Sequence, residues 1–436
     1  MWTYHSDLLE KAVPRYTSYP TAADFGPINP GSLGEAIARA DGDVSLYLHI
    51  PFCEKICYYC GCNTGAAGRR ERVESYLQAL LAELTSVSGL LPKSARVRRI
   101  AFGGGSPNAI EPHEFLGLVE AITSQFATAE AIWSIELDPR SMSGEWGAAI
   151  GHAGITRASM GVQTFAPHCQ RAIGREQSDA LICRSIDWLR STGVTSLNFD
   201  LMYGLPGQTT ADLEDSLEYT RLLGADRVAL FGYAHVPNLV PRQRMIDATA
   251  LADKVERFGM ARLGYEFLTG HGYNAVGFDH FALPYDAMAI AAANGTLRRN
   301  FQGFTDDCSE VIIGLGSSAI SAFPELLAQN EKNSGRYRML ASQGRLTASH
   351  GINRSLRDQL NGATIEKLLC QGLAEITLCQ MPHVRGRLAP FLERGMATID
   401  GMKLKINPDG LPYARSIAGL FDTFRDENTK TFSSAI

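Results

Sequence analysis

Short apolar segments alternate with helical stretches along the first half of the chain. Six of these segments have the length, composition and terminating residues typical of buried β-strands. A helix expected at about residues 71–84 follows the first segment, and helical stretches separate the others. Strands that alternate with helices form parallel sheets, so this order predicts an α/β fold. The repetition favours a partial TIM-like (βα)6 barrel of parallel strands over a nucleotide-binding half. The six expected strands are residues 45–50, 97–102, 132–137, 155–162, 196–203 and 228–233.

The character of the sequence changes after about Gly344. Residues 364–373 and 385–393 are expected to be helical, and a further helix is expected to end near Phe424. Between them, two short strands should form a hairpin around Asp400-Gly401, a favourable two-residue turn. We therefore expect three parts. They are an N-terminal extension near the mouth of the barrel (1–43), a central domain (44–345) with its barrel core at about 44–240, and a small, mainly helical C-terminal domain (346–436).

Charge and hydropathy exclude several classes of partner. The chain has 41 Lys and Arg against 46 Asp and Glu, a formal net charge of −5, so it has no overall basic field for nucleic acid or anionic lipid. The C-terminal hairpin could suggest a DNA-binding wing, but no basic stripe accompanies it. No apolar run approaches the ~18 residues of a membrane span, and the N-terminus lacks a signal peptide pattern. We expect a cytoplasmic protein without nucleic-acid partners or membrane insertion.

Four of the nine cysteines fall within ten residues, directly after the first expected strand. Cys53, Cys57, Cys60 and Cys62 therefore lie on a loop at the carboxyl end of that strand, where α/β proteins place their functional residues. The CxxxCxxC spacing of the first three is rare by chance, and the other five cysteines are scattered. An odd number of cysteines at low density indicates reduced thiols.

Three chemistries fit such a cysteine loop to different extents. A structural zinc site usually takes two separated pairs of ligands, and no second pair is present. A thiol redox site at Cys57 and Cys60 would leave Cys53 and Cys62 without a role. A 4Fe-4S cluster on three thiolates, with its fourth iron open to a ligand, uses the spacing best.

The cysteine spacing resembles the signature of the radical S-adenosylmethionine enzymes. Longer segments are similar to the family of oxygen-independent coproporphyrinogen III oxidases, also called coproporphyrinogen dehydrogenases. The similarity covers nearly all of residues 10–330 in order and is looser beyond, with FDTF at 421–424 as a late match. The segments that carry it include PRYTSYPTA at 14–22, YLHIPFC at 47–53, CGCN at 60–63, SIELDPR at 134–140, SMGVQ at 159–163, DLMYGLP at 200–206 and RNFQG at 299–303.

This resemblance implies an activity and a set of partners. The enzyme would convert two propionates of coproporphyrinogen III to vinyl groups by anaerobic oxidative decarboxylation, giving protoporphyrinogen IX in heme biosynthesis. A 5′-deoxyadenosyl radical from S-adenosylmethionine would start the reaction, and two S-adenosylmethionine molecules per chain are implied. The family also implies a monomer, an electron donor such as flavodoxin or ferredoxin, and a terminal electron acceptor that the sequence does not name.

The resemblance also implies roles for individual residues. Cys53, Cys57 and Cys60 would bind the cluster, whereas Cys62 is characteristic of the family without being a ligand, and would either act on the substrate or only pack. At each of the remaining positions, the alternative to a role in cofactor binding is a purely structural one, as a core side chain or as part of a tight turn. The positions that match S-adenosylmethionine contacts are Tyr47, Tyr59, Gly104, Gly105, Ser106, Glu136, Gln163, Arg175, Asp200, Ala234 and Ile320.

A substrate with four propionates requires cations around the mouth of the barrel. Arg15, Arg298 and Arg299 are the expected cations, and the alternative for each is a solvated surface arginine. Two other functions use the same cluster motif: a heme chaperone of the same superfamily, or a paralogous enzyme that modifies another tetrapyrrole. The CGCN segment and the N-terminal PRYTSYPTA segment, which the chaperone typically lacks, argue against the first. A non-catalytic zinc protein is the remaining alternative.

Overall fold

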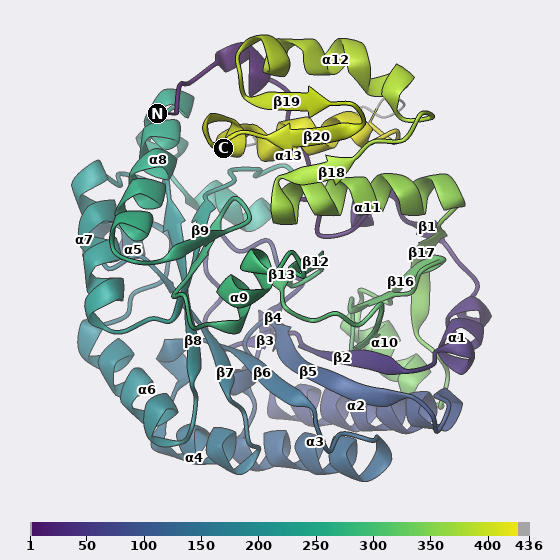
Figure 1. Cartoon of the computed structure of the whole chain (residues 1–436). Coiled ribbons are helices and arrows are strands. Elements are labelled where there is room, and N and C mark those ends of the chain that lie inside the picture. The colour runs from purple at the N-terminus through teal and green to yellow at the C-terminus, as the bar shows by residue number, and fades with distance from the viewer. Residues whose placement is uncertain (1, 426–436) are drawn as a thin grey trace.

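A thirteen-stranded sheet forms the centre of the computed structural model, which describes residues 2–425 (Figure 1). Its strand order is β1-β17-β16-β15-β14-β2-β5-β6-β7-β8-β9-β11-β10, and the seven strands from β14 to β9 are parallel. The predicted α/β partial barrel is confirmed, since its six expected strands correspond to β2 and β5 to β9. The parallel strands are β14 (Val311–Leu315), β2 (Asp43–Ile50), β5 (Arg96–Gly104), β6 (Ile132–Leu137), β7 (Arg157–Gln163), β8 (Ser196–Tyr203) and β9 (Arg227–Gly232).

Helices cover the outer face of these strands (Figure 1). Several of them begin at a residue whose side chain accepts a hydrogen bond from one of the first backbone N–H groups, such as Thr209, which forms a capping box with Asp212. Their apolar faces pack against the strands and bury residues such as Leu80 and Ile122 completely. The covering helices are α2 (Arg70–Leu90), α3 (Pro112–Gln125), α4 (Gly144–His152), α5 (Pro167–Ala172), α6 (Asp179–Ser191), α7 (Thr210–Leu222) and α8 (Lys254–Gly270).

Antiparallel strands extend the sheet at both edges. On one side β14 pairs with β15 (Ile320–Ala322), and on the other β9 pairs with β11 (His280–Ala282). These edges and β14 were not predicted, because β14 pairs with β2 across more than 260 residues of sequence, and no local periodicity signals that contact. The remaining elements around the barrel are β1 (Gly26–Pro27), β3 (Phe52–Cys53), β4 (Gly65–Ala66), β10 (Asn274–Val276), β12 (Arg298–Asn300), β13 (Gly303–Thr305), β16 (Leu326–Asn330), β17 (Ala348–Asn353), α1 (Pro30–Arg39), α9 (Ala287–Ala293) and α10 (Ser334–Ala341).

A small helix-and-hairpin unit lies over one end of the barrel (Figure 1). The hairpin turns at Gly401-Met402 rather than Asp400-Gly401, because Asp400 itself pairs with Lys403. The final expected helix is short, since 3-10 turns with prolines at Pro408 and Pro412 replace its beginning. The unit contains α11 (Leu356–Gln371), β18 (Leu373–Glu375), α12 (Met381–Glu393), β19 (Ala397–Asp400), β20 (Lys403–Ile406) and α13 (Ala414–Ala418).

The expected domain boundary at 345/346 would cut through the large sheet. β17 pairs with β16 and β1, so residues 348–353 belong to that sheet. We propose that the C-terminal unit begins after Asn353. The rest of the predicted C-terminal domain, residues 426–436, lies outside the described residues.

The two ends of the described chain contact each other. The Tyr16 hydroxyl donates to Asp422 Oδ2 at 3.0 Å, and the Tyr413 hydroxyl donates to the Thr3 carbonyl at 2.7 Å. Arg394 forms an ion pair with Asp7 at 2.8 Å. Arg15 also donates to the Gly232 carbonyl of β9. Residues 2–24 therefore connect the barrel to the C-terminal unit, and we call them the strap.

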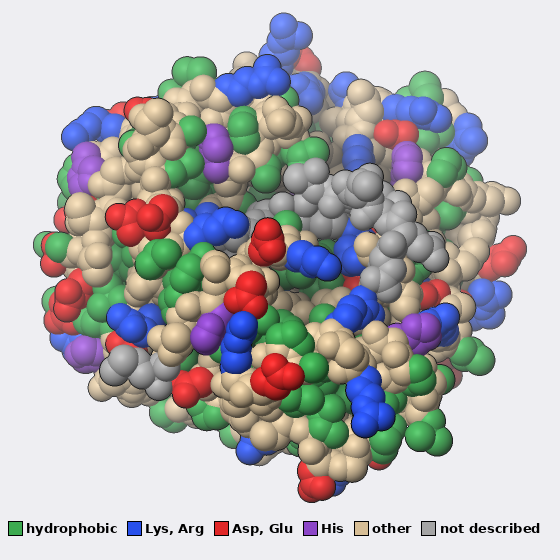
Figure 2. All heavy atoms as spheres, turned by 90° about the horizontal axis from the view of Figure 1, so that it is seen from above, with side chains coloured by type: hydrophobic (Ala, Val, Ile, Leu, Met, Phe, Trp, Pro, Cys, Tyr) green, Lys and Arg blue, Asp and Glu red, His purple; other side chains and the backbone are tan. Residues whose placement is uncertain are grey.

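Surface features agree with the expected absence of a basic stripe on the face that Figure 2 presents. Lys and Arg side chains on this face are interspersed with Asp and Glu. Within residues 2–425, no helix combines the length and the apolar character needed to span a membrane.

Candidate functional site

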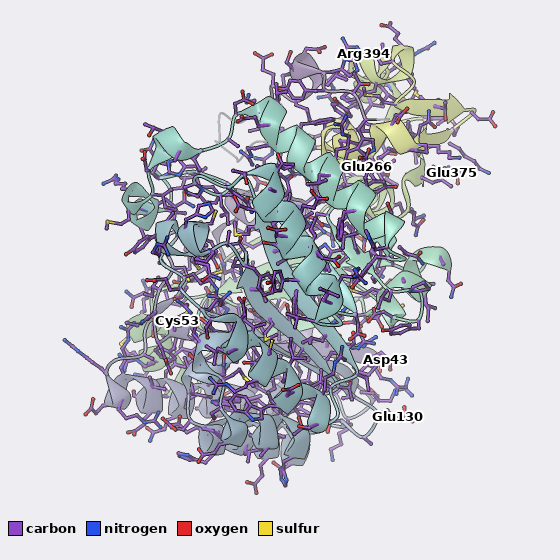
Figure 3. The ribbon with its side chains drawn as sticks, turned by 90° about the vertical axis from the view of Figure 1, so that its left-hand side faces the viewer. Asp43, Cys53, Glu130, Glu266, Glu375 and Arg394 are labelled. Carbon is purple, nitrogen blue, oxygen red and sulfur yellow. The ribbon has the colours of Figure 1, made fainter. Side chains whose placement is uncertain are left out.

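The cysteine loop is fixed at both ends by strand pairing. β3 and β4 pair in parallel, with Phe52 opposite Gly65 and Cys53 opposite Ala66. The loop lies at the carboxyl end of β2, and Figure 3 shows Cys53 far from Asp43 at the start of that strand. All four cysteines of the loop are free thiols. Residues 54–64 therefore form a short closed loop that presents its sulfur atoms at one end of the barrel.

A cavity of about 430 Å³ opens where the parallel strands end. Its walls come from the cysteine loop, from the ends of β5 to β9 and from the N-terminal strap. The structure brings most of the expected site residues together on these walls. They are Arg15, Cys53, Cys57, Tyr59, Cys60, Cys62, Gly104, Gly105, Glu136, Gln163, Arg175, Asp200 and Ala234.

Two arginines lie beside the Cys57 sulfur. Arg140 Nη2 is 3.3 Å and Arg175 Nη1 is 3.4 Å from Cys57 Sγ. Both also pair with Asp138, at 2.7 and 3.1 Å. Burial opposes ionisation of Asp138, but Arg175 and Arg140 outweigh it and hold the pKa of Asp138 below its usual value. The two guanidinium groups can offset the negative charge of a thiolate that binds metal.

The side chains of the loop and its surroundings therefore fit the chemical requirements of an iron-sulfur cluster. Three thiols at the CxxxCxxC positions face one cavity, and two arginines, one buried and one half-buried, are available to offset their negative charge. Thiolates are the ligands that hold 4Fe-4S clusters in proteins. Asp138 and Arg140 were not predicted as site residues, although both belong to the SIELDPR segment that carries the family resemblance.

The β5 strand ends in a glycine that the site requires. Gly104 has a φ of +115°, and a Cβ there would lie 2.6 Å from the His49 ring. Its N–H donates to Glu136 Oε2 at 3.1 Å. The bare backbone at this position lets the end of β5 approach both the cysteine loop and the cavity.

Two half-buried carboxyl groups face the cavity, Glu136 from β6 and Asp200 from β8, the next strand but one in the sheet. Burial raises the pKa of Glu136 to about 7; the Gly104 N–H opposes this shift, and the nearby Asp200 adds a smaller contribution to it. Burial also raises the pKa of Asp200, which accepts hydrogen bonds from Ser159 at 3.0 Å and Asn198 at 2.8 Å. These groups are placed to accept hydrogen bonds from cationic or hydroxyl groups of a ligand.

Gln163 lies at an irregularity in β7. The register shifts between Gly161 and Gln163, and Gln163 has a φ of +69°, a conformation that side chains other than glycine rarely adopt. The irregularity places its amide on the cavity wall. Backbone strain of this kind concentrates at functional sites.

Five expected residues lie outside the set that lines this cavity. Ser106 is 3% exposed, and its hydroxyl donates to Asn108 Oδ1 at 2.7 Å. This hydrogen bond stabilises the loop that follows β5. The Tyr47 hydroxyl lies 3.2 Å from His49 Nδ1, on the β2 strand beneath the loop. Ile320 lies on β15, opposite Gln329.

Two of the expected substrate arginines are also outside it. Arg298 forms an ion pair with Glu366 at 2.7 Å. Arg299 donates to the Arg15 and Tyr16 carbonyls and lies 4.2 Å from the Phe304 ring centroid. Both arginines line a different pocket, between the strap and α11, whereas Arg15 lines the main cavity. Their partners are distant in sequence, which is why the sequence could not show this placement.

Gln243 is a site residue that sequence reasoning missed. It is 2% exposed, and its Nε2 donates to the carbonyls of Tyr59 and Ala234, both at 3.0 Å. These bonds join the cysteine loop to the segment after β9. No pattern around Gln243 signals the role, because its partners lie elsewhere in the chain.

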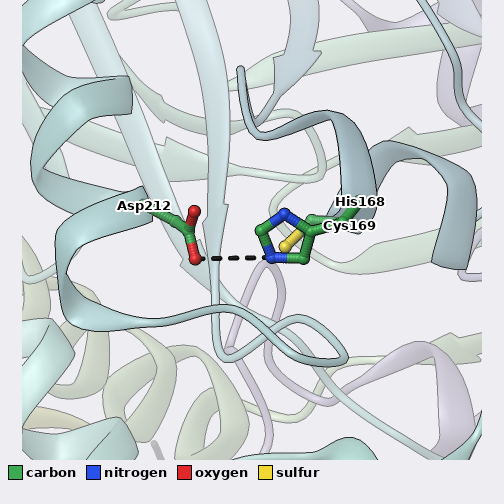
Figure 4. A group of neighbouring side chains, drawn as sticks. All are labelled: His168, Cys169 and Asp212. Atoms are coloured by element: carbon green, nitrogen blue, oxygen red, sulfur yellow. Dashed lines mark ion pairs between the residues drawn. The ribbon is translucent and has the colours of Figure 1, made fainter.

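A second group of metal-ligating residue types lies apart from this cavity (Figure 4). His168 Nε2 lies 3.4 Å from Asp212 Oδ2 and 3.2 Å from the Gly207 carbonyl, and Cys169 is fully buried beside them. Burial raises the pKa of the Cys169 thiol to about 12, which disfavours the thiolate. We interpret the group as a structural connection between α5 and the segment that leads into α7.

Comparison with known proteins gives one consistent family. The Radical SAM superfamily model matches residues 47–220. The chain is 38% identical to the oxygen-independent coproporphyrinogen III oxidase of Bradyrhizobium diazoefficiens, over 98% of both chains. It is 40% identical to that of Paracoccus denitrificans, over 96% of this chain and 95% of the relative. The solved structure of coproporphyrinogen III oxidase from Escherichia coli, described as a radical SAM enzyme, superposes with a TM-score of 0.91 at 32% identity, covering 97% of this chain and 99% of that one.

Proposed function

This chain belongs to the oxygen-independent coproporphyrinogen III oxidase family of the radical SAM superfamily, and we propose that it carries out that family's reaction. The reaction is the anaerobic oxidative decarboxylation of two propionates of coproporphyrinogen III, which gives protoporphyrinogen IX in heme biosynthesis. Similarity over the full length supports this function. The observation that carries it is the convergence of the cysteine loop and the strand-end polar residues on one cavity.

The residues present fit the cofactors that the family implies. Cys53, Cys57 and Cys60 would hold the 4Fe-4S cluster, with Arg140 and Arg175 offsetting its charge. When bound, the cluster and S-adenosylmethionine supply the electron and the carbon-radical chemistry that remove hydrogen from an unactivated propionate. The protein contributes binding, orientation and exclusion of water.

The strand-end residues are proposed to bind S-adenosylmethionine. Glu136 and Asp200 would accept hydrogen bonds from its ammonium and hydroxyl groups, and Gly104 would let the backbone approach it closely. Arg175 already pairs with Asp138 and donates to the Gly161 carbonyl, so its role is to position neighbouring groups and to neutralise charge. Tyr59 offers an aromatic face in the same cavity.

Two S-adenosylmethionine molecules per chain remain part of the proposal. A second cavity of about 320 Å³ lies deeper in the barrel and shares Glu136, Ser159, Asp200 and Phe231 with the first. Together, the two cavities offer room for more than one ligand beside the cluster, which supports this proposal.

We also propose that the protein acts as a cytoplasmic monomer. A flavodoxin or ferredoxin would supply the electron that cleaves S-adenosylmethionine, and an acceptor still to be identified would take the electron that the substrate loses with carbon dioxide. The nine cysteines are all free thiols, which supports a reducing compartment. Cys62 lines the cavity at the family's characteristic position, and its role stays a prediction.

An anaerobic assay tests the function. Reconstituted protein, reduced and supplied with S-adenosylmethionine, is mixed with coproporphyrinogen III, and both carbon dioxide and the oxidised tetrapyrrole product are measured. We expect two molecules of carbon dioxide per molecule of protoporphyrin formed. Tight heme binding without carbon dioxide release would instead identify a heme chaperone, and release from a different tetrapyrrole would identify a paralogous enzyme.

A further inference from the structure

The deeper cavity has a histidine on its wall that the proposed cofactor sites leave without a role. His280 begins β11 and pairs with Ala229 of β9, so it lies beside Phe231 on the face of the sheet that lines this cavity. Only 13% of its side chain is exposed, so a ligand must enter the cavity to reach it. Phe231 also lines the main cavity, which places His280 close to the junction of the two.

The imidazole ring of His280 is held in one orientation by three neighbours. Its Nδ1 lies 2.6 Å from Asp279 Oδ1. Phe231 and Phe304 pack against it in edge-to-face geometry, with ring centroids 5.5 and 5.3 Å from that of the imidazole. A ring fixed in this way has little freedom left to lose when a ligand binds, so the group is pre-organised for binding.

Asp279 determines which nitrogen of the ring carries hydrogen. Burial opposes the ionisation of this carboxyl group, but His280, Arg299 and Arg15 hold its pKa below the usual value. An ionised carboxylate can only accept a hydrogen bond, so Nδ1 is the donor in the contact with Asp279. In the neutral imidazole this leaves a lone pair on Nε2.

Nε2 is the free end of this pair of residues. It has no hydrogen-bond partner within the part of the chain that the structure describes. Asp200, a carboxyl group on the same cavity wall, accepts hydrogen bonds from Ser159 and Asn198 instead. Gly303 has a φ of +116°, and its missing Cβ would lie 3.7 Å from Nε2, so glycine leaves this space open. The pair therefore offers the cavity a hydrogen-bond acceptor.

The substrate of the proposed reaction carries donors that fit such an acceptor. A porphyrinogen has an N–H group on each of its four pyrroles, and its saturated bridges let each pyrrole tilt until the N–H points away from the ring centre. The oxidised porphyrin with the same side chains is planar and turns its two remaining N–H groups inward. An acceptor on the cavity wall therefore reaches an N–H of the porphyrinogen and none of the porphyrin.

We propose that the pair of His280 and Asp279 accepts a hydrogen bond from a pyrrole N–H of the substrate and thereby selects the reduced, porphyrinogen state. This inference rests on the proposed function, which makes the substrate a porphyrinogen. His280 contacts the substrate directly, whereas Asp279 is a positioning residue that fixes the tautomer of His280. The role is one of binding and selectivity and includes no proton transfer.

Two ligands that share all four propionates test the pair without turnover. Anaerobic isothermal titration calorimetry with the reconstituted protein measures the Kd of coproporphyrinogen III and that of coproporphyrin III. His280→Phe keeps an aromatic ring but removes the acceptor. It should raise the Kd of coproporphyrinogen III about tenfold and leave that of coproporphyrin III unchanged. His280→Gln keeps an acceptor and should recover part of the loss.

His271→Phe is the matched control. His271 follows α8 directly and stacks on Phe267, with ring centroids 4.2 Å apart, and it lines neither cavity. This variant should leave both Kd values unchanged, and iron content should be the same in all variants. Equal weakening of both tetrapyrroles in His280→Phe would overturn the inference, since the effect would not depend on the N–H groups, and so would an unchanged Kd for coproporphyrinogen III.

Two further results separate this inference from the proposed function. Added heme whose Soret band shifts with wild type but not with His280→Phe would identify the imidazole as an iron ligand and overturn its role toward N–H groups. Binding of coproporphyrinogen III that depends on His280, in a wild type that releases no carbon dioxide, would support the pair and refute the proposed reaction. Carbon dioxide release with no effect of His280→Phe on binding would overturn the pair alone.

Discussion

At the scale of single residues, charge around Cys57 distinguishes this loop from an ordinary cluster of thiols. Cys57 is 5% exposed and lies within reach of both Arg140 and Arg175. Asp138 fixes both arginines, so the cationic environment exists before any metal arrives. Because these side chains are already in position, cluster binding requires less rearrangement of the protein.

Replacing Cys57 should therefore abolish cluster binding. Anaerobically reconstituted wild type should contain about four iron atoms per chain, and Cys57→Ala should lose them, because three thiolates are the minimum protein ligand set of this motif. Iron and sulfide analysis, with the absorbance near 400 nm, measures the loss. Cys183→Ala, outside the loop, serves as the control and should keep its iron. Stoichiometric zinc in the wild type would contradict the prediction.

Glu136 should give the stability of the cofactor-free protein a defined pH dependence. Its pKa rises from 4.5 to about 7 on folding, mainly through burial. The folded state then holds a proton that the unfolded state has lost, so this group lowers the free energy of unfolding as the pH rises from about 4.5 to 7. Glu136→Gln removes the penalty, and it should be more stable than wild type by about 3 kcal/mol at pH 8, since each pKa unit between 4.5 and about 7 corresponds to about 1.4 kcal/mol.

Urea unfolding at pH 5 and pH 8 would measure this difference, which should shrink toward pH 5. Glu120→Gln on the exposed face of α3 provides the comparison. A difference between wild type and Glu136→Gln that is the same at both pH values would contradict the assigned pKa.

At the scale of elements, the ends of the strands make the site. β5 ends in glycine, β6 in the segment containing Glu136 and Asp138, β7 in the irregularity at Gln163, and β8 carries Asp200. Parallel strands bring these ends together at one edge of the sheet. The loops between strands and helices can differ in sequence while the strands keep their alignment.

Gly104→Ala should therefore destabilise the protein by about 2 kcal/mol, because the new Cβ meets the His49 ring and the backbone is left-handed there. Gly117→Ala is the control, since Gly117 lies inside α3 with open space around it, and it should add up to about 1 kcal/mol. Chemical unfolding measures both. Equal effects of the two substitutions would contradict the close packing at the end of β5.

The elements also show what sequence could and could not predict. The six strands were located because buried parallel strands are short apolar runs that end in recognisable turns. The cysteine loop followed from its position after the first of them. β14 was missed because its partner β2 is distant in sequence. The ion pair between Arg298 and Glu366 could not be foreseen for the same reason, because no local pattern connects the two residues. Local chemistry was predictable, whereas contacts between distant segments were not.

At the scale of the whole molecule, the strap and the C-terminal unit together line the pocket that contains Arg298 and Arg299. Asp422 is fully buried and accepts hydrogen bonds from Tyr16 and from Arg425 Nε at 2.9 Å. Arg425 also pairs with Asp24, so one network joins the first and last described segments. Arg15, one residue before Tyr16, is positioned through the same strap.

Asp422→Ala should loosen this network. Removing the carboxylate leaves buried hydrogen-bond donors without their acceptor, which should cost about 3 kcal/mol. Limited trypsin digestion should then cut faster at Lys11, which is exposed within the strap. Asp400→Ala, at the exposed end of β19, is the control. Unchanged cleavage in Asp422→Ala would show that the strap is held by other contacts.

The pairing of the first and last segments sets an order of events during synthesis. The ribosome releases Tyr16 and the cysteine loop early and Asp422 near the end. The strap therefore lacks its partner until nearly the whole chain has been made, and the hydrogen bond between Tyr16 and Asp422 forms only after every strand of the barrel has been synthesised.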